Sequence, residues 1–262
     1  MVYLGIDIGS LSCDAVLVDE GERVVAWRVV PTGARNLEAI AAARRGVLEQ
    51  AGVDEVSVAA TVATGYGRNR VDGRLAAVTE ITCHARGVRA LLPGTRLLVD
   101  IGGQDSKAIL LDGEGRVAEF AMNDKCAAGT GRFLEAMARG LQVELADLAE
   151  LDRQATERTL TLSSMCTVFA ESEVVSLIAE GAAVAEIVNG LHRAIAARTQ
   201  ALVRRIAPAV DGLQVAMSGG VARNAGVVSA VSAALGREVS VPAEPDTVGA
   251  LGAALIARER HG

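Results

Sequence analysis

Two short segments of the chain share a pattern of residues suited to binding phosphate and a cation. Residues 4–24 and 97–117 align without a gap at an offset of 93 residues, which places Asp7 on Asp100. In each copy an apolar run ends in Asp-Ile-Gly, passes through small polar residues and enters a second apolar run. The pattern predicts a strand, a tight turn and a second strand. Such a turn lets backbone N–H groups approach a phosphate, while the Asp can reach a hydrated cation.

The two turns carry different polar side chains. Ser10 and Ser12 of the first turn can donate hydrogen bonds to a phosphate. The second turn offers a water-orienting amide, an acid and a cation, which are Gln104, Asp105 and Lys107. One Asp-Ile-Gly alone would indicate only a tight β-turn, but its duplication favours two related domains that clamp one nucleotide. The site is not of the Walker type, because no Gly-x-x-x-x-Gly-Lys-Ser/Thr motif occurs.

A third segment, Met217 to Asn224 (MSGGVARN), predicts a strand, a glycine turn and the start of a helix. Gly219 and Gly220 would let a flat ring or a ribose approach the backbone, and Asn224 could donate or accept a hydrogen bond nearby. Taken alone, the segment is about equally consistent with a simple turn. Beside the two hairpins it favours nucleotide binding.

Two cysteines are candidate metal ligands. Cys126 (in NDKCAAGTGR) and Cys166 (in SSMCTVFAE) each follow residues typical of helix caps and precede an amphipathic pattern. Each thiol is therefore expected at or near a helix N-terminus, where the helix dipole stabilises the metal-binding thiolate. Two thiolates are too few for a tetrahedral four-thiolate site, but a two-fold dimer would supply four. The alternative that both are small buried residues stays open, and packing is favoured for Cys13 and Cys83.

Composition restricts the class of protein. The 262 residues are 50% hydrophobic, which is enough for a substantial core, and the net charge is −6. The absence of a long basic run argues against nucleic acid and against a membrane surface as partners. No stretch reaches about 18 uninterrupted apolar residues, and the chain enters a strand rather than a signal sequence. We therefore expect a cytoplasmic protein whose cysteines are reduced thiols or ligands.

Strand patterns mixed with helical patterns and joined by short links predict an α/β fold. The boundary near Pro93-Gly94 predicts an N-terminal lobe of residues 1–94, with the C-terminal helix packing back onto it, and a second lobe of residues 95–245. Beyond the hairpins, the expected strands are 23–30, 56–63, 116–121 and 213–217, and the expected helices are 36–52, 125–140, 145–151, 167–181, 184–206 and 246–260.

The motifs together resemble the ATP-dependent activators of 2-hydroxyacyl-CoA dehydratases, a family that also includes the ATPase subunits of benzoyl-CoA reductases. The resemblance covers essentially the whole chain, to GALGAAL at residues 249–255, and the two cysteine motifs are its most specific part. It implies a duplicated actin-like, Hsp70-like, acetate and sugar kinase superfamily (ribonuclease H-like) ATPase fold, with two domains around a nucleotide cleft. The motifs are GIDIGS, ATGYGRN, VDIGGQDSKAI, MNDKCAAGTGRFLE, CTVFAESEV and SGGVARN.

The resemblance also implies cofactors and partners. It implies a homodimer that holds one [4Fe–4S] cluster through Cys126 and Cys166 of both subunits. It further implies ATP or ADP with Mg²⁺ in each subunit, and hydrolysis coupled to one-electron transfer from ferredoxin or flavodoxin to a partner dehydratase or reductase. Nucleotide-driven closure of the two domains would then reorient the helices that hold the cluster.

On the matched positions, the resemblance implies roles for individual residues. Asp7 and Asp100 would hold the hydrated Mg²⁺, and Gln104 would position the attacking water with Asp105 as a possible acid/base helper. The phosphates would be bound by Gly9, Ser10, Ser12, Gly102 and Gly103, with Lys107 nearby, and the adenosine would be bordered by Gly219, Gly220 and Asn224.

Two alternative functions are left open by the hairpins alone. A small-molecule kinase of the same superfamily would need a substrate pocket and gives no role to the two cysteines. A non-enzymatic nucleotide switch or chaperone-like module is the other. His192 and His261 are expected to be solvated or structural.

Overall fold

A computed structural model describes residues 1–162 and 166–261. The chain divides into two compact units, and each is built from separate stretches of sequence. The first unit comprises Met1–Leu98, Leu111–Glu119 and the stretch from Pro242 onward, and the second comprises Val99–Leu110 and Phe120–Val241. The C-terminal residues thus belong to the same unit as the N-terminal ones.

The first sheet has five strands in the order β3-β2-β1-β4-β5. The strand β1 pairs antiparallel with β2 and parallel with β4, and the register places Asp7 opposite Asp14. The first hairpin is therefore confirmed. The strands are β1 (Val2–Ile8), β2 (Ser12–Asp19), β3 (Val24–Pro31), β4 (Val58–Gly65) and β5 (Ala76–Ala77).

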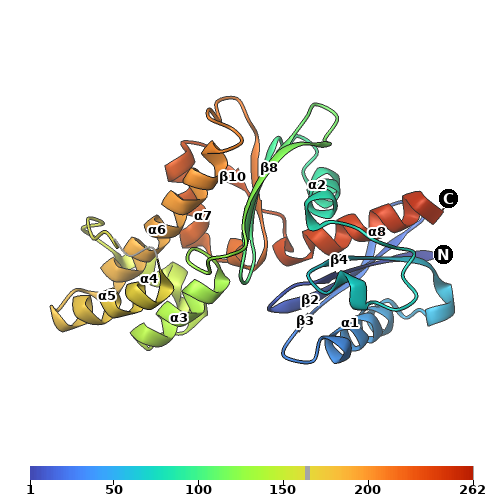
Figure 1. Cartoon of the computed structure of the whole chain (residues 1–262), viewed down its shortest axis with the longest axis horizontal. Coiled ribbons are helices and arrows are strands. Elements are labelled where there is room, and N and C mark those ends of the chain that lie inside the picture. Colours follow the sequence, from blue (N-terminus) through green and yellow to red (C-terminus); the bar gives the residue numbers. More distant parts are fainter. Residues whose placement is uncertain (163–165, 262) are drawn as a thin grey trace. The chain divides into compact units, whose positions relative to one another are not determined.

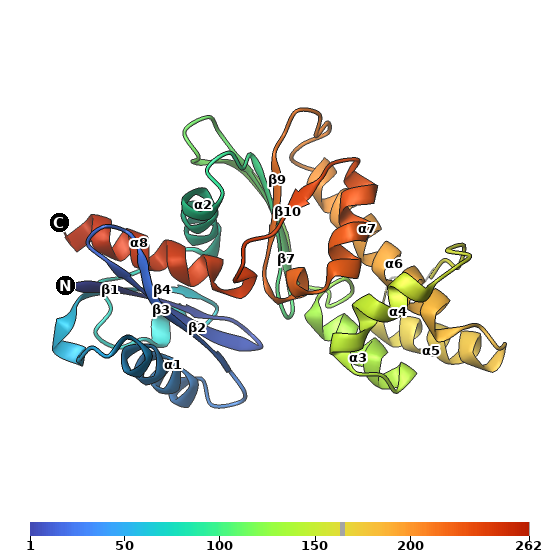
Figure 2. The same ribbon diagram turned by 180° about the vertical axis from the view of Figure 1, so that it is seen from behind.

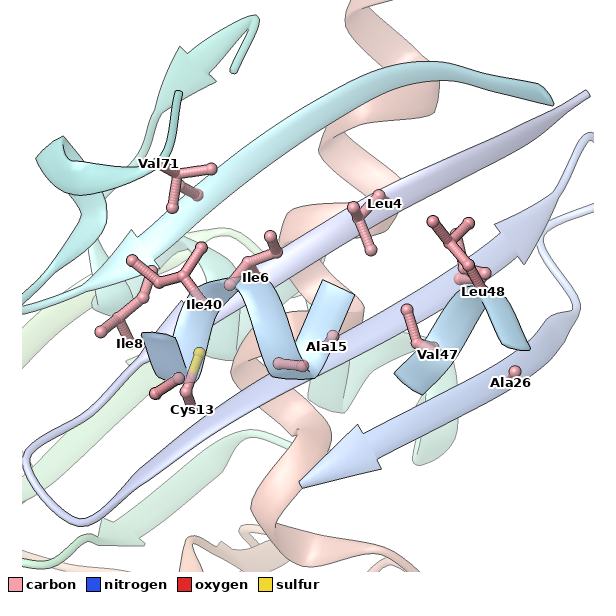
Figure 3. Packing of buried hydrophobic residues seen from close by; sticks show 14 of the residues in the cluster. Leu4, Ile6, Ile8, Cys13, Ala15, Ala26, Ile40, Val47, Leu48 and Val71 are labelled. Atoms are coloured by element: carbon pink, nitrogen blue, oxygen red, sulfur yellow. The ribbon is translucent and has the colours of Figure 1, made fainter. Parts of the chain in front are cut away.

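Helices cover both faces of this sheet, which explains why every residue of β1 is buried. Because successive side chains of a strand point to opposite faces, Leu4 and Ile6 join the core beneath α1 (Figure 3). Tyr3 joins the core on the other face, with α8. Figure 2 shows α1 and α8 on the two sides of the sheet. The helical elements are α1 (Asn36–Ala51), η1 (Glu55–Ser57), η2 (Arg68–Arg70), α2 (Glu80–Leu91), η5 (Pro245–Thr247) and α8 (Val248–His261).

The contact between α8 and α2 is close at the level of the backbone. A Cβ at Gly252 of α8 would collide with the carbonyl oxygen of Cys83 in α2. Only glycine fits there, and the two helices pack tightly on the sheet as a result.

The second sheet repeats the strand order of the first. It reads β8-β7-β6-β9-β10, so that β6 and β7 take the places of β1 and β2. The α/β class, the duplication and the second hairpin are confirmed. The two-residue strands β5 and β10 were not anticipated, since two residues carry no readable alternation. The strands are β6 (Leu97–Ile101), β7 (Ser106–Leu111), β8 (Val117–Asn123), β9 (Val215–Ser218) and β10 (Val239–Ser240).

Most helices of the chain's second half gather in a single bundle within the second unit (Figure 1). There α6 packs on α7, α4 lies against both, and α5 contacts α3 and α6. No helix among the described residues is long and apolar enough to cross a membrane. The elements are α3 (Gly131–Leu141), η3 (Leu145–Asp147), α4 (Leu148–Gln154), α5 (Thr167–Ala179), α6 (Val184–Arg204), η4 (Gly220–Arg223) and α7 (Ala225–Leu235).

Candidate functional site

The first hairpin closes with a hydrogen bond from the Gly9 N–H to the Ser12 carbonyl oxygen at 2.9 Å. Gly9, Ser10 and Ser12 are half-buried, so their polar groups stay within reach of a ligand. The Asp7 carboxylate, at the end of β1, is only 7% exposed. A buried acid and a turn of small polar residues therefore lie next to each other at the end of β1.

Asp14 is a second buried acid in this hairpin, which sequence reasoning missed. Its Oδ2 accepts a hydrogen bond from the Ser12 hydroxyl at 3.1 Å, but its Oδ1 has no hydrogen-bond partner among the described residues. Burial and the nearby Asp7 and Asp246 carboxylates raise the pKa of Asp14 well above its ordinary value. The signal in the sequence was the alternation of β2, which places residue 14 on the same face as its cross-strand partner Asp7.

Asp7 is enclosed by backbone. A Cβ at Gly249, in α8, would collide with Asp7 Oδ2 and come within 2.7 Å of the His84 ring. Gly65, at the end of β4, has φ +85° and lies against Asp7 Oδ1. Side chains at these positions would displace the carboxylate, so the two glycines set its place.

The second hairpin has the same backbone and a different charge arrangement. The Gly102 N–H donates to the Asp105 carbonyl oxygen at 3.0 Å, which matches the closing bond of the first hairpin. Lys107 Nζ lies 3.1 Å from Asp100 Oδ2 and 2.7 Å from Asp105 Oδ2, and all three side chains are buried. Gln104 is exposed at the tip of the turn. Two acids and one base thus form a compact buried ion cluster.

The Met217–Asn224 segment lies against this cluster. The Ser218 hydroxyl donates to Asp100 Oδ1 at 2.8 Å, and Gly219, at φ +83°, lies against the Ile101 carbonyl. Gly220 is exposed beside them. The Asn224 side chain caps α7, because its Oδ1 accepts hydrogen bonds from N–H groups in the first turn of that helix. The structure therefore brings Gly219 and Gly220 to the second hairpin and fixes Asn224 as a helix cap.

The second hairpin is joined directly to α3. The Gly131 N–H donates to the Gly102 carbonyl oxygen, and the Arg132 N–H to that of Gly103, both at 2.9 Å. These are first-turn donors of a helix, which have no partner inside it. The turn that is predicted to bind phosphate thus satisfies the start of α3.

Cys126 lies in the loop before α3 rather than at its start, so the expectation of a helix beginning at residue 125 is wrong. The chain reverses here, because the Thr130 N–H donates to the Ala127 carbonyl oxygen and Gly129 has φ +90°. The Asn123 side chain donates to the Cys126 carbonyl at 3.1 Å. Cys126 itself is exposed.

A cation from α6 lies beside this loop. Arg198 stacks over the Phe133 ring at 5.6 Å, and a Cβ at Gly129 would lie 3.2 Å from its Cδ. Burial lowers the pKa of Arg198, and the electrostatic interaction with Cys126 opposes that shift. The guanidinium therefore lies beside the loop that carries Cys126.

Cys166 is the N-cap residue of α5, as expected, and its thiol is exposed. The helix that follows buries Ala170 and Val174 but leaves four larger apolar side chains exposed. They are Val168, Phe169, Val175 and Ile178, with exposed fractions of 66, 68, 56 and 42%. Residues 163–165, which directly precede Cys166, lie outside the described range.

The other two cysteines contrast with this pair. Cys13 and Cys83 are both completely buried, which confirms the packing interpretation. Burial raises the pKa of Cys83 to about 12 and that of Cys13 further, so both are neutral thiols. Cys126 and Cys166 are the two cysteines that solvent or a second chain can reach.

The comparisons with known proteins agree over the whole length. The chain is 48% identical over 261 residues to the activator of lactoyl-CoA dehydratase of Anaerotignum propionicum, covering 99% of this chain and 98% of that protein. The crystal structure of component A of the (R)-2-hydroxyglutaryl-CoA dehydratase of Acidaminococcus fermentans superposes with a TM-score of 0.94 at 42% identity, covering 100% and 99% of the two chains. An ADPNP-bound activator of the 2-hydroxyisocaproyl-CoA dehydratase of Clostridium difficile superposes at 0.92 with 41% identity, covering 100% and 96%.

The model of the BadF/BadG/BcrA/BcrD ATPase family matches residues 4–257, nearly the entire chain. The resemblance seen in the motifs is therefore confirmed by sequence and by structure. The chain belongs to the BadF/BadG/BcrA/BcrD ATPase family.

Proposed function

We propose that the protein is an ATP-hydrolysing activator that passes one low-potential electron to a partner enzyme of the 2-hydroxyacyl-CoA dehydratase or benzoyl-CoA reductase type. The observation that carries the proposal is the contrast among the cysteines. Two are buried and neutral, whereas Cys126 and Cys166 are exposed in the unit that also carries the second hairpin. The relatives named above support the choice of partner, since two are activators of dehydratases and the third is a dehydratase component.

The nucleotide would be held by the two hairpins. In this proposal Asp7 and Asp100 bind Mg²⁺ through its water ligands, a mode that suits a cation reluctant to lose its hydration shell. Both oxygens of Asp100 already have partners, Lys107 and Ser218. A carboxylate oxygen accepts more than one hydrogen bond, so metal-bound waters fit beside them.

Backbone and side-chain donors of the turns would bind the phosphates, and the exposed Gln104 would orient the attacking water. Lys107 is paired with Asp100 and Asp105. We therefore assign its charge to holding these carboxylates, with a phosphate as a secondary partner. The phosphate turns comprise Gly9, Ser10, Ser12, Gly102 and Gly103, and the adenosine side comprises Gly219, Gly220 and Asn224. Because the N–H groups of Gly9 and Gly102 close their own hairpins, these two glycines would contribute close approach rather than donors.

The redox group would be shared by two copies of the chain. Among residues 1–162 and 166–261 there is no cluster of three or more His, Cys, Asp or Glu side chains that could hold a metal. Two exposed thiols per chain become four in a two-fold homodimer, which is the ligand set of a [4Fe–4S] cluster. The exposed apolar side chains of α5, directly after Cys166, are suited to burial against the second copy. A bound cluster supplies the one-electron chemistry, with ferredoxin or flavodoxin as donor.

This chain's own residues then perform three tasks. Cys126 and Cys166 hold the group, and Arg198 lies beside Cys126 as a balancing positive charge. The backbone bonds from Gly131 and Arg132 to the phosphate turn tie the Cys126 loop to the nucleotide site. A small-molecule kinase gives no role to the exposed thiols, and a cytoplasmic location stays a prediction from the sequence.

Anaerobic purification tests the proposal. We expect a brown dimer with about four irons per dimer. Cys126→Ala and Cys166→Ala should each lose the iron and retain ADPNP binding, whereas Cys13→Ala serves as the matched control and should retain both. Asp7→Asn and Asp100→Asn should do the reverse, keeping iron and losing ATP hydrolysis. A colourless, iron-free protein after reconstitution under reducing conditions would overturn the proposal.

A further inference from the structure

A buried polar network crosses the helical bundle of the second unit. His192, on α6, is completely buried and lies between two polar partners from other elements. Its Nε2 is 3.3 Å from Asn224 Nδ2, and its Nδ1 is 3.6 Å from Asp152 Oδ2. Asn189, one turn earlier on α6, donates to Asp152 Oδ1 at 2.7 Å. Sequence reasoning expected a solvated or structural histidine here and had no signal for these contacts.

The geometry fixes the direction of the hydrogen bonds. Because Asn224 Oδ1 accepts from the N–H groups of Gly226 and Val227, its Nδ2 is the donor toward His192. His192 Nε2 is then the unprotonated acceptor, and the ring proton is on Nδ1, facing Asp152. The imidazole therefore lies between Asn224, which follows the glycine turn, and Asp152, near the end of α4, with one ring nitrogen facing each.

The network is incompletely satisfied as it stands. His192 Nδ1 and Asn189 Oδ1 are buried and have no hydrogen-bond partner within the described part of the chain. A distance of 3.6 Å is too long for a hydrogen bond, and an unsatisfied buried polar atom costs free energy. A closer approach of the ring to Asp152 would satisfy His192 Nδ1 and leave Asn189 Oδ1 as it is.

The helix α6 is also hydrogen-bonded to the segment that leads to Cys166. The Glu186 carboxylate, in the first turn of α6, accepts hydrogen bonds from the backbone N–H groups of Thr156, Glu157 and Arg158 at 2.6, 2.9 and 2.8 Å. These bonds, led by the one from Glu157, lower the pKa of Glu186.

Two further contacts hold the same segment to α6. Arg193 donates to the Arg158 carbonyl oxygen at 2.5 Å. Leu160 lies so close to α6 that a Cβ at Gly190 would be 2.8 Å from its Cδ2. Residues 156–160 are therefore fixed to α6 before the chain reaches Cys166.

We propose that His192 is a positioning residue that couples the nucleotide turn at residues 219–224 to the position of Cys166, with α6 as the rigid connection. The coupling rests on the proposed function, because it requires that a nucleotide binds beside Gly219 and Gly220. A shift of Asn224 on nucleotide binding displaces the His192 side chain through the contact at Nε2. The helix α6 follows and carries residues 156–160 with it.

Two substitutions test the contacts of the two ring nitrogens separately. His192→Gln places an acceptor near the Nε2 position and preserves the contact with Asn224. His192→Asn places polar atoms near the Nδ1 position and loses that contact. A purely structural role would make the two variants alike, whereas coupling through Asn224 requires that Gln retains it and Asn does not. His261→Gln, an exposed histidine at the end of α8, is the matched control.

The measurement is the rate at which iodoacetamide labels Cys166 in the full-length, iron-free protein, resolved by peptide mass spectrometry, with and without saturating Mg²⁺–ADPNP. For a coupling of ordinary size we expect the wild-type rate to change at least about fivefold. The His192→Gln and His261→Gln variants should retain this change. The His192→Asn variant should lose most of it, with ADPNP affinity within about twofold of wild type by calorimetry.

Glu186→Gln offers a second test at the other end of α6. This variant should weaken the hydrogen bonds that hold residues 156–158 to α6. It should therefore reduce the effect of ADPNP on the labelling rate of Cys166. A wild-type labelling rate that ignores bound ADPNP, or a full response in His192→Asn, would overturn the coupling. Failure of ADPNP to bind the wild type would instead overturn the proposed function, and calorimetry distinguishes the two outcomes.

Discussion

Asp14 and Lys107 occupy the same place in the two copies of the hairpin, 93 residues apart, and they carry opposite charges. In the second copy, Lys107 lies between Asp100 and Asp105 and neutralises part of their charge. In the first copy, Asp14 faces Asp7 across the strand pair, and burial together with Asp7 raises its pKa. The two backbones close with the same hydrogen bond. Duplication has thus kept the geometry and changed how the acid at the end of the strand is neutralised.

This difference predicts how each hairpin responds to substitution. The second hairpin depends on a charge supplied by its own chain, and removing that charge leaves acids without a cation. The first hairpin depends on a proton, or on a cation from outside. The same kind of substitution should therefore have opposite consequences in the two copies.

The largest effect is expected at Lys107. Lys107→Met leaves Asp100 and Asp105 buried with uncompensated charge, which should lower the free energy of unfolding by about 3–5 kcal/mol. The measurement is urea unfolding of the nucleotide-free protein followed by circular dichroism. An unchanged unfolding midpoint at pH 8 would show that the ion cluster contributes nothing.

An intermediate effect, which depends on pH, is expected at Asp14. Its folded-state pKa is raised, so between about pH 4 and that raised value the folded state holds a proton that the unfolded chain has released. The free energy of unfolding of the wild type therefore falls as the pH rises through this window. Asp14→Asn keeps the shape and removes the titration.

The stability of Asp14→Asn relative to the wild type should therefore rise from pH 4 to pH 8, by about 1.4 kcal/mol for each unit of pKa difference. Urea unfolding at several pH values measures it. Asp19→Asn is the matched control, because the pKa of half-buried Asp19 is lowered rather than raised, through its hydrogen bonds to Arg23. Parallel stability curves for Asp14→Asn and wild type would remove the contrast between the hairpins.

The smallest effect is expected at Ser12. Ser12→Ala removes the hydroxyl that donates to Asp14, a single hydrogen bond worth about 1 kcal/mol. Since that bond favours the ionised form of Asp14, the variant should also raise the pKa of Asp14 further. Two-dimensional NMR titration of the Asp14 carboxyl would detect the shift, and a lowered pKa would contradict it.

The features that recur in the sequence were predicted, and those that depend on distant partners were not. The two hairpins followed from the repeat, and the strand order confirmed it. The burial of His192 could not be predicted, since its partners Asp152 and Asn224 come from elements 40 residues before and 32 residues after it in the chain. The pairing of Lys107 with Asp100 and Asp105 was missed for a related reason. In a sequence, a lysine beside a phosphate turn indicates a phosphate ligand. Only the structure shows that the Lys107 side chain lies between two acids.

Cys126 shows a limit of local patterns. Capping residues and an apolar periodicity predicted a helix from residue 125, but a turn at Gly129 delays it to Gly131. Glycine at 129 is compatible with both interpretations, and only the hydrogen bonds of Gly131 and Arg132 to the hairpin fix where the helix starts.

The last helix of the chain, α8, has a consequence for how the protein is made. The core of the first unit contains Ala250, Ala253 and Leu255 of α8, packed on the strands formed by the first residues. During synthesis on the ribosome, residues 1–98 emerge long before their partner helix, whereas the stretches of the second unit are all complete by residue 241. The unit that is translated first is therefore finished last. Until α8 emerges, the apolar side chains on one face of its sheet lack the helix that buries them.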